Sequence, residues 1–245
     1  MTTNIPDDHP RAASLRTREA MKDAVAAGLV HPTGLIAHGR GEAFDYLLGE
    51  RTPPEAREAV AEAARLLRAA KQPVLSLNGN VVALAARQAV AVQKAFPRLV
   101  LEVNLFHRTP ERVEALVAVV EAAGATKGSV LGRAPDFRIP NLSSDRALCS
   151  KAGLGGSDVV VVPLEDGDRC QALVAMGKTV IAIDLNPLSR TAVAAHVTIV
   201  DELTRALPAL AAALKTSSPG AVGGTYDNAD VLRRVKARMA AGLGA

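Results

Sequence analysis

The sequence is poor in aromatic residues and in cysteine, and each shortage excludes a class of protein. Aromatic residues make up 2% of the 245 residues and tryptophan is absent, so few rings are present on which single-stranded nucleic acid could stack. The two cysteines, Cys149 and Cys170, match neither the spacing of a zinc knuckle nor a C-x-x-C redox pair. We therefore expect no nucleic-acid partner, no structural zinc, and reduced thiols in a cytoplasmic protein.

Long hydrophobic runs are also absent. The first 19 residues are polar and charged, and no window of about 18 uninterrupted apolar residues occurs, which predicts neither a membrane span nor an export signal. The 29 Lys and Arg exceed the 25 Asp and Glu by four, and the basic residues are scattered among the acidic ones. This balance favours a small anionic ligand over a polyanion.

From residue 73 onward, short apolar runs alternate with helical stretches. Residues 159–162 show no polar alternation, as expected of a strand that is covered on both faces. Strands separated by single helices predict parallel pairing with right-handed crossovers. The expected fold class is therefore α/β, a doubly wound, mostly parallel sheet with helices on both faces and strands at residues 73–77, 99–103, 128–132, 158–163, 179–185 and 197–200.

The chain divides into three parts by pattern. Residues 1–72 form an N-terminal helical segment packed on the core, residues 73–215 form a nucleotide-binding core, and residues 216–245 form a linker with a C-terminal helix. Helices are predicted at 11–29 and 53–71, whereas glycines interrupt 34–52, which we predict to be a loop or loop-helix junction. Residues 132–157 lack periodicity, and so long a loop is usually functional or mobile.

Polar residues follow four of the predicted strands, at the edge where ligands bind in open parallel sheets. Asn78-Gly79-Asn80 could bind a phosphate through its backbone or form an ordinary turn with an asparagine cap. Further along, Asn104 and Arg108 suit an anion clamp better than the neighbouring His107 does, and the carboxylates Glu165, Asp166 and Asp168 could hold Mg²⁺ or complement a helix dipole.

The stretch VIAIDLNPLSRTA, residues 180–192, carries more polar groups than a turn requires. Asp184 could accept hydrogen bonds from a ribose or cap its own turn, and Arg190 could meet a phosphate. In the N-terminal segment, glycines flank Arg40, which lets the backbone approach a ligand. The ordinary explanation for Arg18 is that it lies on a solvent-exposed helix face. For His38, the ordinary explanation is a structural role.

Several strings resemble, in order from about residue 8 to 203, the archaeal-type phosphopantothenate synthetase (4-phosphopantoate–β-alanine ligase) family: HPRAASLRTRE, GLIAHGRGEAFDYLLGERT, PVLSLNGNVVAL, EVNLFHRTPERV, DVVVVPLEDGDR, IDLNPLSRTA and TIVD. That family converts ATP, 4-phosphopantoate and β-alanine to 4'-phosphopantothenate, AMP and pyrophosphate on the route to coenzyme A. The resemblance implies a homodimer with a Rossmann-like core, no membrane attachment, and ATP as substrate with Mg²⁺.

The resemblance also implies roles for individual residues. It implies catalytic arginines at 18, 40 and 190, and ATP contacts at Arg18, Arg40, Asp184, Leu185, Asn186, Arg190, Thr191 and Glu202. Glu202 stands where the family has an amide. Geometry suggests phosphopantoate contacts at Asn78, Gly79, Asn80, Asn104 and Arg108, and no metal ligand is assigned. The β-alanine site is likewise left open.

The sequence departs from the family in two places, and two other functions compete with this interpretation. Residues 141–157 and 216–225 do not match the family pattern, so the sequence assigns no role to them. The same fold suits an NAD(P)-dependent oxidoreductase, although a G-x-G-x-x-G fingerprint is missing. A nucleotide-sensing module without catalysis is the other alternative.

Overall fold

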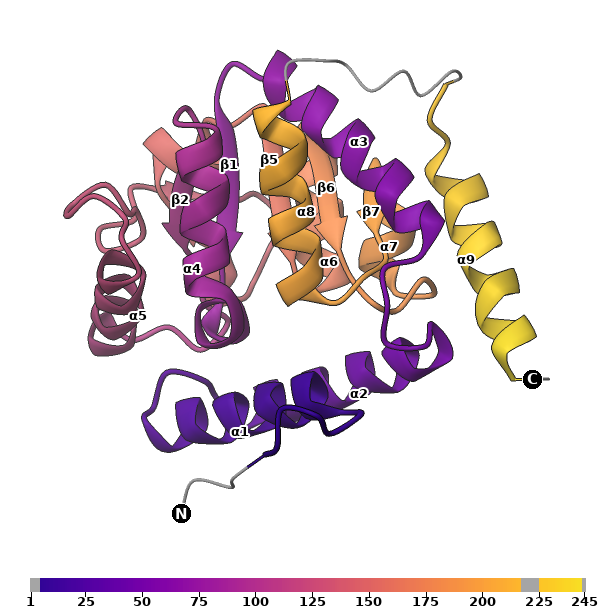
Figure 1. Cartoon of the computed structure of the whole chain (residues 1–245). Coiled ribbons are helices and arrows are strands. Elements are labelled where there is room, and N and C mark those ends of the chain that lie inside the picture. The colour runs from indigo at the N-terminus through magenta and orange to yellow at the C-terminus, as the bar shows by residue number, and fades with distance from the viewer. Residues whose placement is uncertain (1–4, 217–224, 244–245) are drawn as a thin grey trace.

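The protein is described by a computed structural model covering residues 5–216 and 225–243 (Figure 1). The strands are β1 (Pro73–Leu77), β2 (Val100–Val103), β3 (Phe137–Arg138), β4 (Leu148–Cys149), β5 (Val159–Pro163), β6 (Thr179–Ile183) and β7 (Val197–Ile199). The α-helices are α1 (Ala12–Ala26), α2 (Thr33–Leu47), α3 (Pro54–Ala69), α4 (Gly79–Ala95), α5 (Pro110–Ala122), α6 (Gly167–Ala175), α7 (Arg190–Ala194), α8 (Leu203–Lys215) and α9 (Asn228–Gly242). Two short turns, the 3-10 helix η1 (Asp145–Ala147) and the π-helical η2 (Lys151–Gly155), complete the elements.

The main sheet has the strand order β2-β1-β5-β6-β7, and every neighbouring pair is parallel. Successive side chains of a strand point to opposite faces, and both faces are buried here. Leu75 and Leu77 pack with α3, α4 and α8, whereas Val74 packs on the other face with α6 and the segment 137–154. The predicted α/β class, the parallel pairing and the helices on both faces are confirmed.

The N-terminal helices α1 and α2 lie across the carboxyl end of the sheet, where they cover the strand ends (Figure 1). By contrast, α3 packs on the sheet beside α8 and shares the main hydrophobic core. The C-terminal helix α9 lies against α3, on the side near β7. The division at residues 72 and 215 remains a prediction, and the linker predicted from residue 216 lies largely outside the described residues.

The prediction of a loop or loop-helix junction at residues 34–52 is wrong for residues 34–47, which belong to α2. Its glycines lower helix propensity, but tertiary contacts override this cost. The backbone oxygen of Gly34 accepts a hydrogen bond from the Asn80 side chain at 2.9 Å, and Gly41 faces Leu185. Small residues therefore let α2 lie close to the strand ends.

The strand predicted at residues 128–132 is also wrong. Leu131 makes a single parallel bridge with Glu102 beside β2. Gly128 and Gly132 have φ angles of +80° and +120°, so the extended backbone breaks on both sides of the bridge.

The aperiodic segment 132–157 is ordered by contacts with β2 rather than by periodic structure of its own. It contains β3, η1, β4 and η2, of which β3 and β4 form a short antiparallel pair. The carboxylate of Glu102, which is 0% exposed, accepts hydrogen bonds from the backbone nitrogens of Ser150 and Leu154, both at 2.7 Å. One buried side chain of the sheet therefore fixes the path of this loop.

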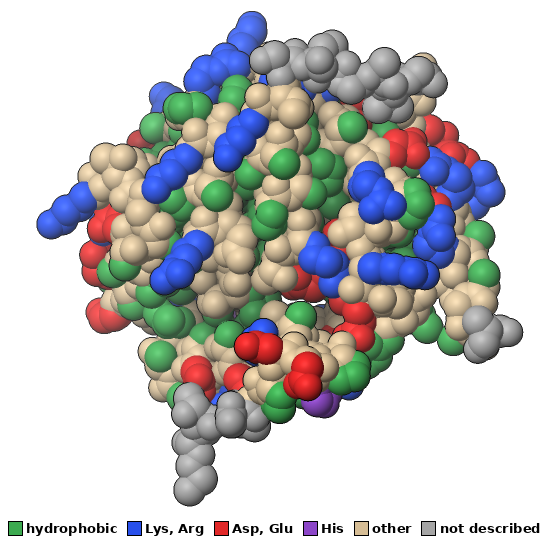
Figure 2. All heavy atoms as spheres, viewed as in Figure 1, with side chains coloured by type: hydrophobic (Ala, Val, Ile, Leu, Met, Phe, Trp, Pro, Cys, Tyr) green, Lys and Arg blue, Asp and Glu red, His purple; other side chains and the backbone are tan. Residues whose placement is uncertain are grey.

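Lys and Arg side chains are spread over the face seen in Figure 2 and form no single basic tract, as the sequence indicated. Acidic side chains gather where the N-terminal helices meet the rest of the molecule, and the surface is hollowed there. None of the helices in the described ranges is long and apolar enough to cross a membrane.

Candidate active site

The direction in which the chain adds strands to the sheet reverses after β2. The chain runs from β1 outward to β2 and then returns to β5 on the other side of β1, so its connections diverge between the carboxyl ends of β1 and β5. Ligands of doubly wound sheets bind in the crevice at such a switch point. Asn78 spans it, because its Nδ2 donates to the backbone oxygens of Pro163 and Leu164 at 3.0 and 3.1 Å. Its Oδ1 also accepts from the Val81 nitrogen, so Asn78 is the cap of α4.

A cavity of about 140 Å³ lies at this point, and we call it the switch-point pocket. Its lining residues are His31, Thr33, Gly34, Ala37, Asn78, Gly79, Asn80, Leu105, Phe106, His107, Arg112, Arg146 and Leu164. Gly79 and Asn80 belong to the first turn of α4, whose backbone N–H groups and dipole favour an anion. A Cβ at Gly79 would lie 2.8 Å from the Leu29 oxygen, so only glycine allows this close approach.

Cationic and imidazole side chains surround the switch-point pocket. The rings of His31 and His107 stack with centroids 3.8 Å apart. Arg112 donates to the Leu29 oxygen at 3.0 and 3.1 Å and to the His107 oxygen at 2.7 Å, and so ties the N-terminal helices to the loop after β2. Burial lowers the pKa of His107, and the neighbouring His31 and Arg112 lower it further. An anion bound here would relieve this repulsion.

A second cavity of about 210 Å³ adjoins the first, because Ala37 and Leu164 line both. We call it the carboxylate pocket; it lies between α1, α2 and the start of α8. Its lining residues are Pro10, Arg11, Ala13, Ser14, Thr17, Ala37, His38, Gly41, Glu42, Asp45, Glu50, Leu84, Leu164, Leu185, Asp201, Glu202, Leu203, Thr204 and Arg205. Apolar walls with acceptors at the edge suit a group of low charge that donates hydrogen bonds, as a nucleoside does.

The carboxylates of this pocket are held by neighbours on three elements. Glu42 accepts hydrogen bonds from Ser14 and from Arg18 Nε, the latter at 2.8 Å. Burial opposes the charge of Glu42, but these hydrogen bonds outweigh it and hold the pKa of Glu42 below its ordinary value. Arg205 pairs with both Asp45 and Asp201 and thereby joins α2 to α8.

His38 lies in the wall of the carboxylate pocket, and its Nε2 is buried without a hydrogen-bond partner. Burial lowers the pKa of His38 below 6.5, and the charge of Arg18 acts in the same direction, although Glu42 and Glu202 oppose it. His38 is thus a neutral imidazole near pH 7.

We expect the folded state to resist protonation of His38. The NMR titration midpoint of His38 should lie below 6.5 in the folded protein and nearer that value in urea. Because the unfolded chain binds this proton more readily, the free energy of unfolding should fall as the pH drops through 6.5. In His38→Gln this fall should be shallower. An unchanged pH dependence in that variant would contradict the assignment.

The turn at residues 184–189 is held by hydrogen bonds to the side chain of Asp184. Asp184 accepts hydrogen bonds from the Asn186 nitrogen, at 2.9 Å, and from the Ser189 hydroxyl. Burial raises the pKa of Asp184, although these bonds and the charge of Arg40 oppose the rise. Leu185 is buried and lines the carboxylate pocket, as does Glu202, which caps α8. The turn is therefore already rigid beside the pocket.

The three predicted catalytic arginines line neither pocket. Arg18 pairs with Glu42 and donates to the Tyr46 hydroxyl at 2.6 Å. Arg190 pairs with Asp168 at 2.8 Å, and both side chains are mostly exposed. Arg40 is exposed on α2 close to Asp184. Their catalytic roles remain a prediction.

Three further predicted residues also line neither pocket, and their side chains donate hydrogen bonds to backbone oxygens. Asn104 is 0% exposed, and its Nδ2 donates to the backbone oxygens of Arg146 and Leu148, at 3.3 and 2.8 Å. Arg108 donates to the Gly132 oxygen at 2.5 Å. The Thr191 hydroxyl donates to the Glu165 oxygen at 2.9 Å. In this conformation these side chains make hydrogen bonds to backbone oxygens, and their contacts with a ligand remain predictions.

Sequence reasoning missed four polar residues of the switch-point pocket and most polar residues of the carboxylate pocket. In the switch-point pocket, His31 and Thr33 lie in the N-terminal segment, Arg112 lies in α5, and Arg146 lies in the aperiodic loop. The one signal that could have pointed to Arg146 was the length of the aperiodic loop 132–157, because long loops are often functional. No spacing rule places Arg146 beside the end of β5.

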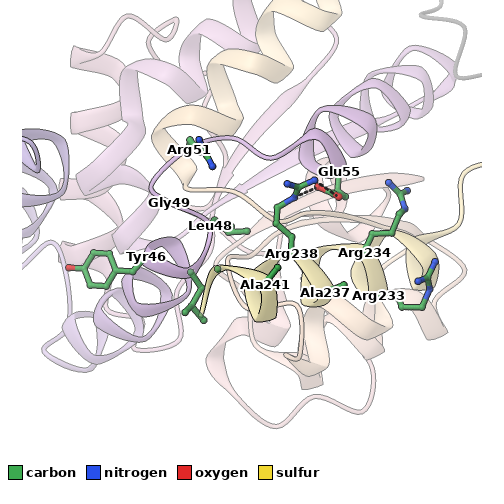
Figure 3. Close-up of a pocket in the computed structure, with 12 residues that line it drawn as sticks. Tyr46, Leu48, Gly49, Arg51, Glu55, Arg233, Arg234, Ala237, Arg238 and Ala241 are labelled. Carbon is green, nitrogen blue, oxygen red and sulfur yellow. Dashed lines mark hydrogen bonds and ion pairs between the residues drawn. The ribbon is translucent and has the colours of Figure 1, made fainter. Parts of the chain in front are cut away.

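A further hollow lies between α9 and the junction of α2 with α3 (Figure 3). Arg238 points across it to Glu55, with which it makes two hydrogen bonds of 3.0 Å. Arg233 pairs with Asp230 on the same helix, as does Arg234. Most of its arginines are already paired with carboxylates, so this hollow offers little unpaired positive charge to an anionic ligand.

Comparison with known proteins identifies similar chains. The family model described as phosphopantothenate/pantothenate synthetase matches residues 55–241. A 4-phosphopantoate–β-alanine ligase of Methanospirillum hungatei is 52% identical over 209 residues, covering 84% of this chain and 83% of that protein. A protein of the same name from Thermococcus kodakarensis is 44% identical over 246 residues, covering 96% of this chain and 94% of its own length.

Proposed function

The chain belongs to the phosphopantothenate/pantothenate synthetase family, and we propose on this basis that it is a 4-phosphopantoate–β-alanine ligase of coenzyme A biosynthesis. Similar proteins of that name cover most of the chain. The observation that carries the proposal in physical terms is the pair of adjoining pockets, one cationic and one lined by carboxylates and apolar groups, at the switch point.

The reaction proceeds in two steps without a covalent enzyme intermediate. The carboxylate of 4-phosphopantoate attacks the α-phosphorus of ATP, the bond to the β-phosphate breaks, and pyrophosphate leaves with that electron pair. The neutral amine of β-alanine then attacks the acyl carbon of the mixed anhydride. AMP leaves, the nitrogen loses a proton to solvent, and an amide remains.

The two pockets suit the two larger substrates. ATP places its nucleoside in the carboxylate pocket, beside Leu185 and Glu202, while Asp184 and Asn186 hold the turn next to it. The acid substrate occupies the switch-point pocket at Asn78, Gly79 and Asn80. The shared wall at Ala37 and Leu164 supports this arrangement, because the reacting carboxylate must reach the α-phosphate.

The protein contributes positioning and electrostatic stabilisation. Arg18, Arg40 and Arg190 neutralise the charge that develops on the phosphates during adenylation. Among residues 5–216 and 225–243, no group of three or more His, Cys, Asp or Glu side chains is arranged to hold a metal ion. We therefore propose that Mg²⁺ arrives bound to the triphosphate, as is usual for this cation, and assign no step to it.

We further propose that the protein is a cytoplasmic homodimer. Large apolar side chains stand exposed on the surface, among them Ile36 at 65% and Val193 at 68%, and a second copy would cover them. The two buried cysteines are free, as expected of a reducing compartment. Light scattering of the purified protein gives the mass that tests the dimer.

A coupled assay for AMP, with each substrate omitted in turn, tests the function. We expect AMP and pyrophosphate only when ATP and 4-phosphopantoate are both present, and amide product only when β-alanine is added. ATP binding without turnover would instead identify a nucleotide sensor. Hydride transfer from or to a nicotinamide cofactor would identify an oxidoreductase.

A further inference from the structure

Arg146 combines burial with an unused binding edge. The residue is 6% exposed and lines the switch-point pocket. Its Nη1 donates to the carboxylates of Glu165 and Asp166. Its Nε is buried without a hydrogen-bond partner, and Nη2 makes no hydrogen bond to any described residue. The Nε–Nη2 edge of a guanidinium is the fork that binds a phosphate or carboxylate with two parallel hydrogen bonds.

The backbone of Arg146 is fixed from behind. Asn104, at the end of β2, donates to the backbone oxygen of Arg146, and Glu102 holds the next part of the loop through Ser150 and Leu154. The loop 132–157, to which the sequence assigned no role, thus brings an arginine from a distant part of the chain to the strand ends. This placement is independent of the Asp184 turn and of the three predicted catalytic arginines.

The side chain of Arg146 is fixed by a buried chain of charges. The side chain of Glu165 is 1% exposed. Its Oε1 accepts a hydrogen bond from Arg146, and its Oε2 accepts one from Arg169. Arg169 is 0% exposed and donates to the Ser76 hydroxyl of β1 at 3.1 Å. Glu165 and Asp166 together balance the charges of Arg146 and Arg169, so what the cluster offers a ligand is the unpaired Nε–Nη2 edge of Arg146 and not an excess of positive charge.

The chemistry of the acid substrate decides which of its ends faces Arg146. This substrate has a carboxylate at one end and a phosphoryl group at the other. The carboxylate must lie at the wall shared with the carboxylate pocket in order to reach ATP. The phosphoryl group is then left in the switch-point pocket, where Arg112, the two histidines and the first turn of α4 also converge.

We propose that Arg146 binds the phosphoryl group of the acid substrate through its Nε–Nη2 edge, and that Glu165 is the positioning residue that orients it. This inference rests on the proposed function. It makes Arg146 the residue that selects a phosphorylated acid over the same acid without the phosphoryl group.

The test compares 4-phosphopantoate with pantoate, which lacks the phosphoryl group. Calorimetry measures the dissociation constant of each acid, and of ATP, for the full chain and for Arg146→Lys, which keeps the charge but loses the fork. We expect the affinity for 4-phosphopantoate to fall by about 10- to 100-fold and that for pantoate and ATP to stay within about 2-fold. Arg87→Lys, an exposed arginine on α4, is the matched control and should change none of them.

The positioning role of Glu165 is tested by the KM values of the two substrates. In steady-state assays, Glu165→Gln should raise the KM for 4-phosphopantoate while the KM for ATP stays unchanged, and Glu165→Asp should recover part of the loss. Equal rises in both KM values would indicate a general structural defect and overturn the positioning role.

Equal weakening of both acids in Arg146→Lys, or no weakening, would overturn the assignment of Arg146. Failure of the proposed function has a different signature. If the unaltered protein binds 4-phosphopantoate but forms no AMP, and Arg146→Lys weakens that binding, the binding site is supported and the ligase activity is refuted. Circular dichroism of each variant confirms that only folded protein is compared.

Discussion

Replacing Arg40 by alanine should lower kcat for AMP formation by about 10²- to 10³-fold, the loss typical of one well-placed donor to transition-state charge. Arg40 is exposed on α2, and its guanidinium lies near enough to Asp184 to act on that carboxylate. Because Arg40 is exposed, its removal leaves no cavity, and Asp184 keeps its hydrogen bonds from Asn186 and Ser189. The midpoint of thermal unfolding should therefore change little while turnover collapses.

Arg87→Ala is the matched control for Arg40→Ala. Both residues are exposed arginines on helices, but Arg87 lies on α4 and lines neither pocket. Its removal should leave turnover within about 2-fold, as expected when the protein's charge changes far from the reacting phosphates. Near-normal turnover of Arg40→Ala would remove Arg40 from the mechanism. Equal losses in both variants would point to a general effect of net charge.

Glu165→Gln should destabilise the fold by about 3–5 kcal/mol, because removing one partner of a buried ion pair leaves its counter-charge without compensation. Arg169 is fully buried, and Glu165 is the carboxylate with which it pairs. The neutral amide of glutamine keeps the volume of the side chain but not its charge. Urea unfolding followed by circular dichroism measures the change as a shift of the midpoint.

Glu114→Gln provides the comparison. Glu114 pairs with Arg133 on the surface, where its side chain is 59% exposed, so water screens the pair and replaces it when it is lost. Its midpoint should not move measurably. If Glu165→Gln were as stable as Glu114→Gln, the buried cluster could not be fixing the strand ends, and Arg146 would lose its support.

Much of the fold could be predicted from the sequence because the signals were local. Residues 159–162 read as a doubly covered strand and form the buried strand β5. Thr109-Pro110 opens a stretch that predicts a helix over residues 110–122, and α5 has these bounds. Gly124 and Gly177, where the sequence predicts that helices stop, follow α5 and α6 with φ angles of +106° and +77°. Periodicity and terminal glycines are properties of short segments, so tertiary structure had little to alter.

The errors arose where contacts between distant residues outweighed local propensity. Residues 34–47 contain three glycines and read as a loop, yet they are helical because α2 fits against Asn80 and Leu185. Residues 128–132 read as a strand, yet only Leu131 pairs. Of the predicted site residues, Asn78, Gly79, Asn80, Leu185 and Glu202 line the two pockets.

The sequence by itself determined the family and the parallel α/β architecture, and it predicted the edge of the sheet at which ligands bind. These follow from long matched strings and from the alternation of strands and helices, both of which are linear properties of the chain. Only the tertiary structure decided that His31, Arg112 and Arg146 share one cavity with the first turn of α4. The physical reason is that a buried carboxylate, a buried amide and a strand order out of sequence bring them together, and none of these leaves a periodic trace in the sequence.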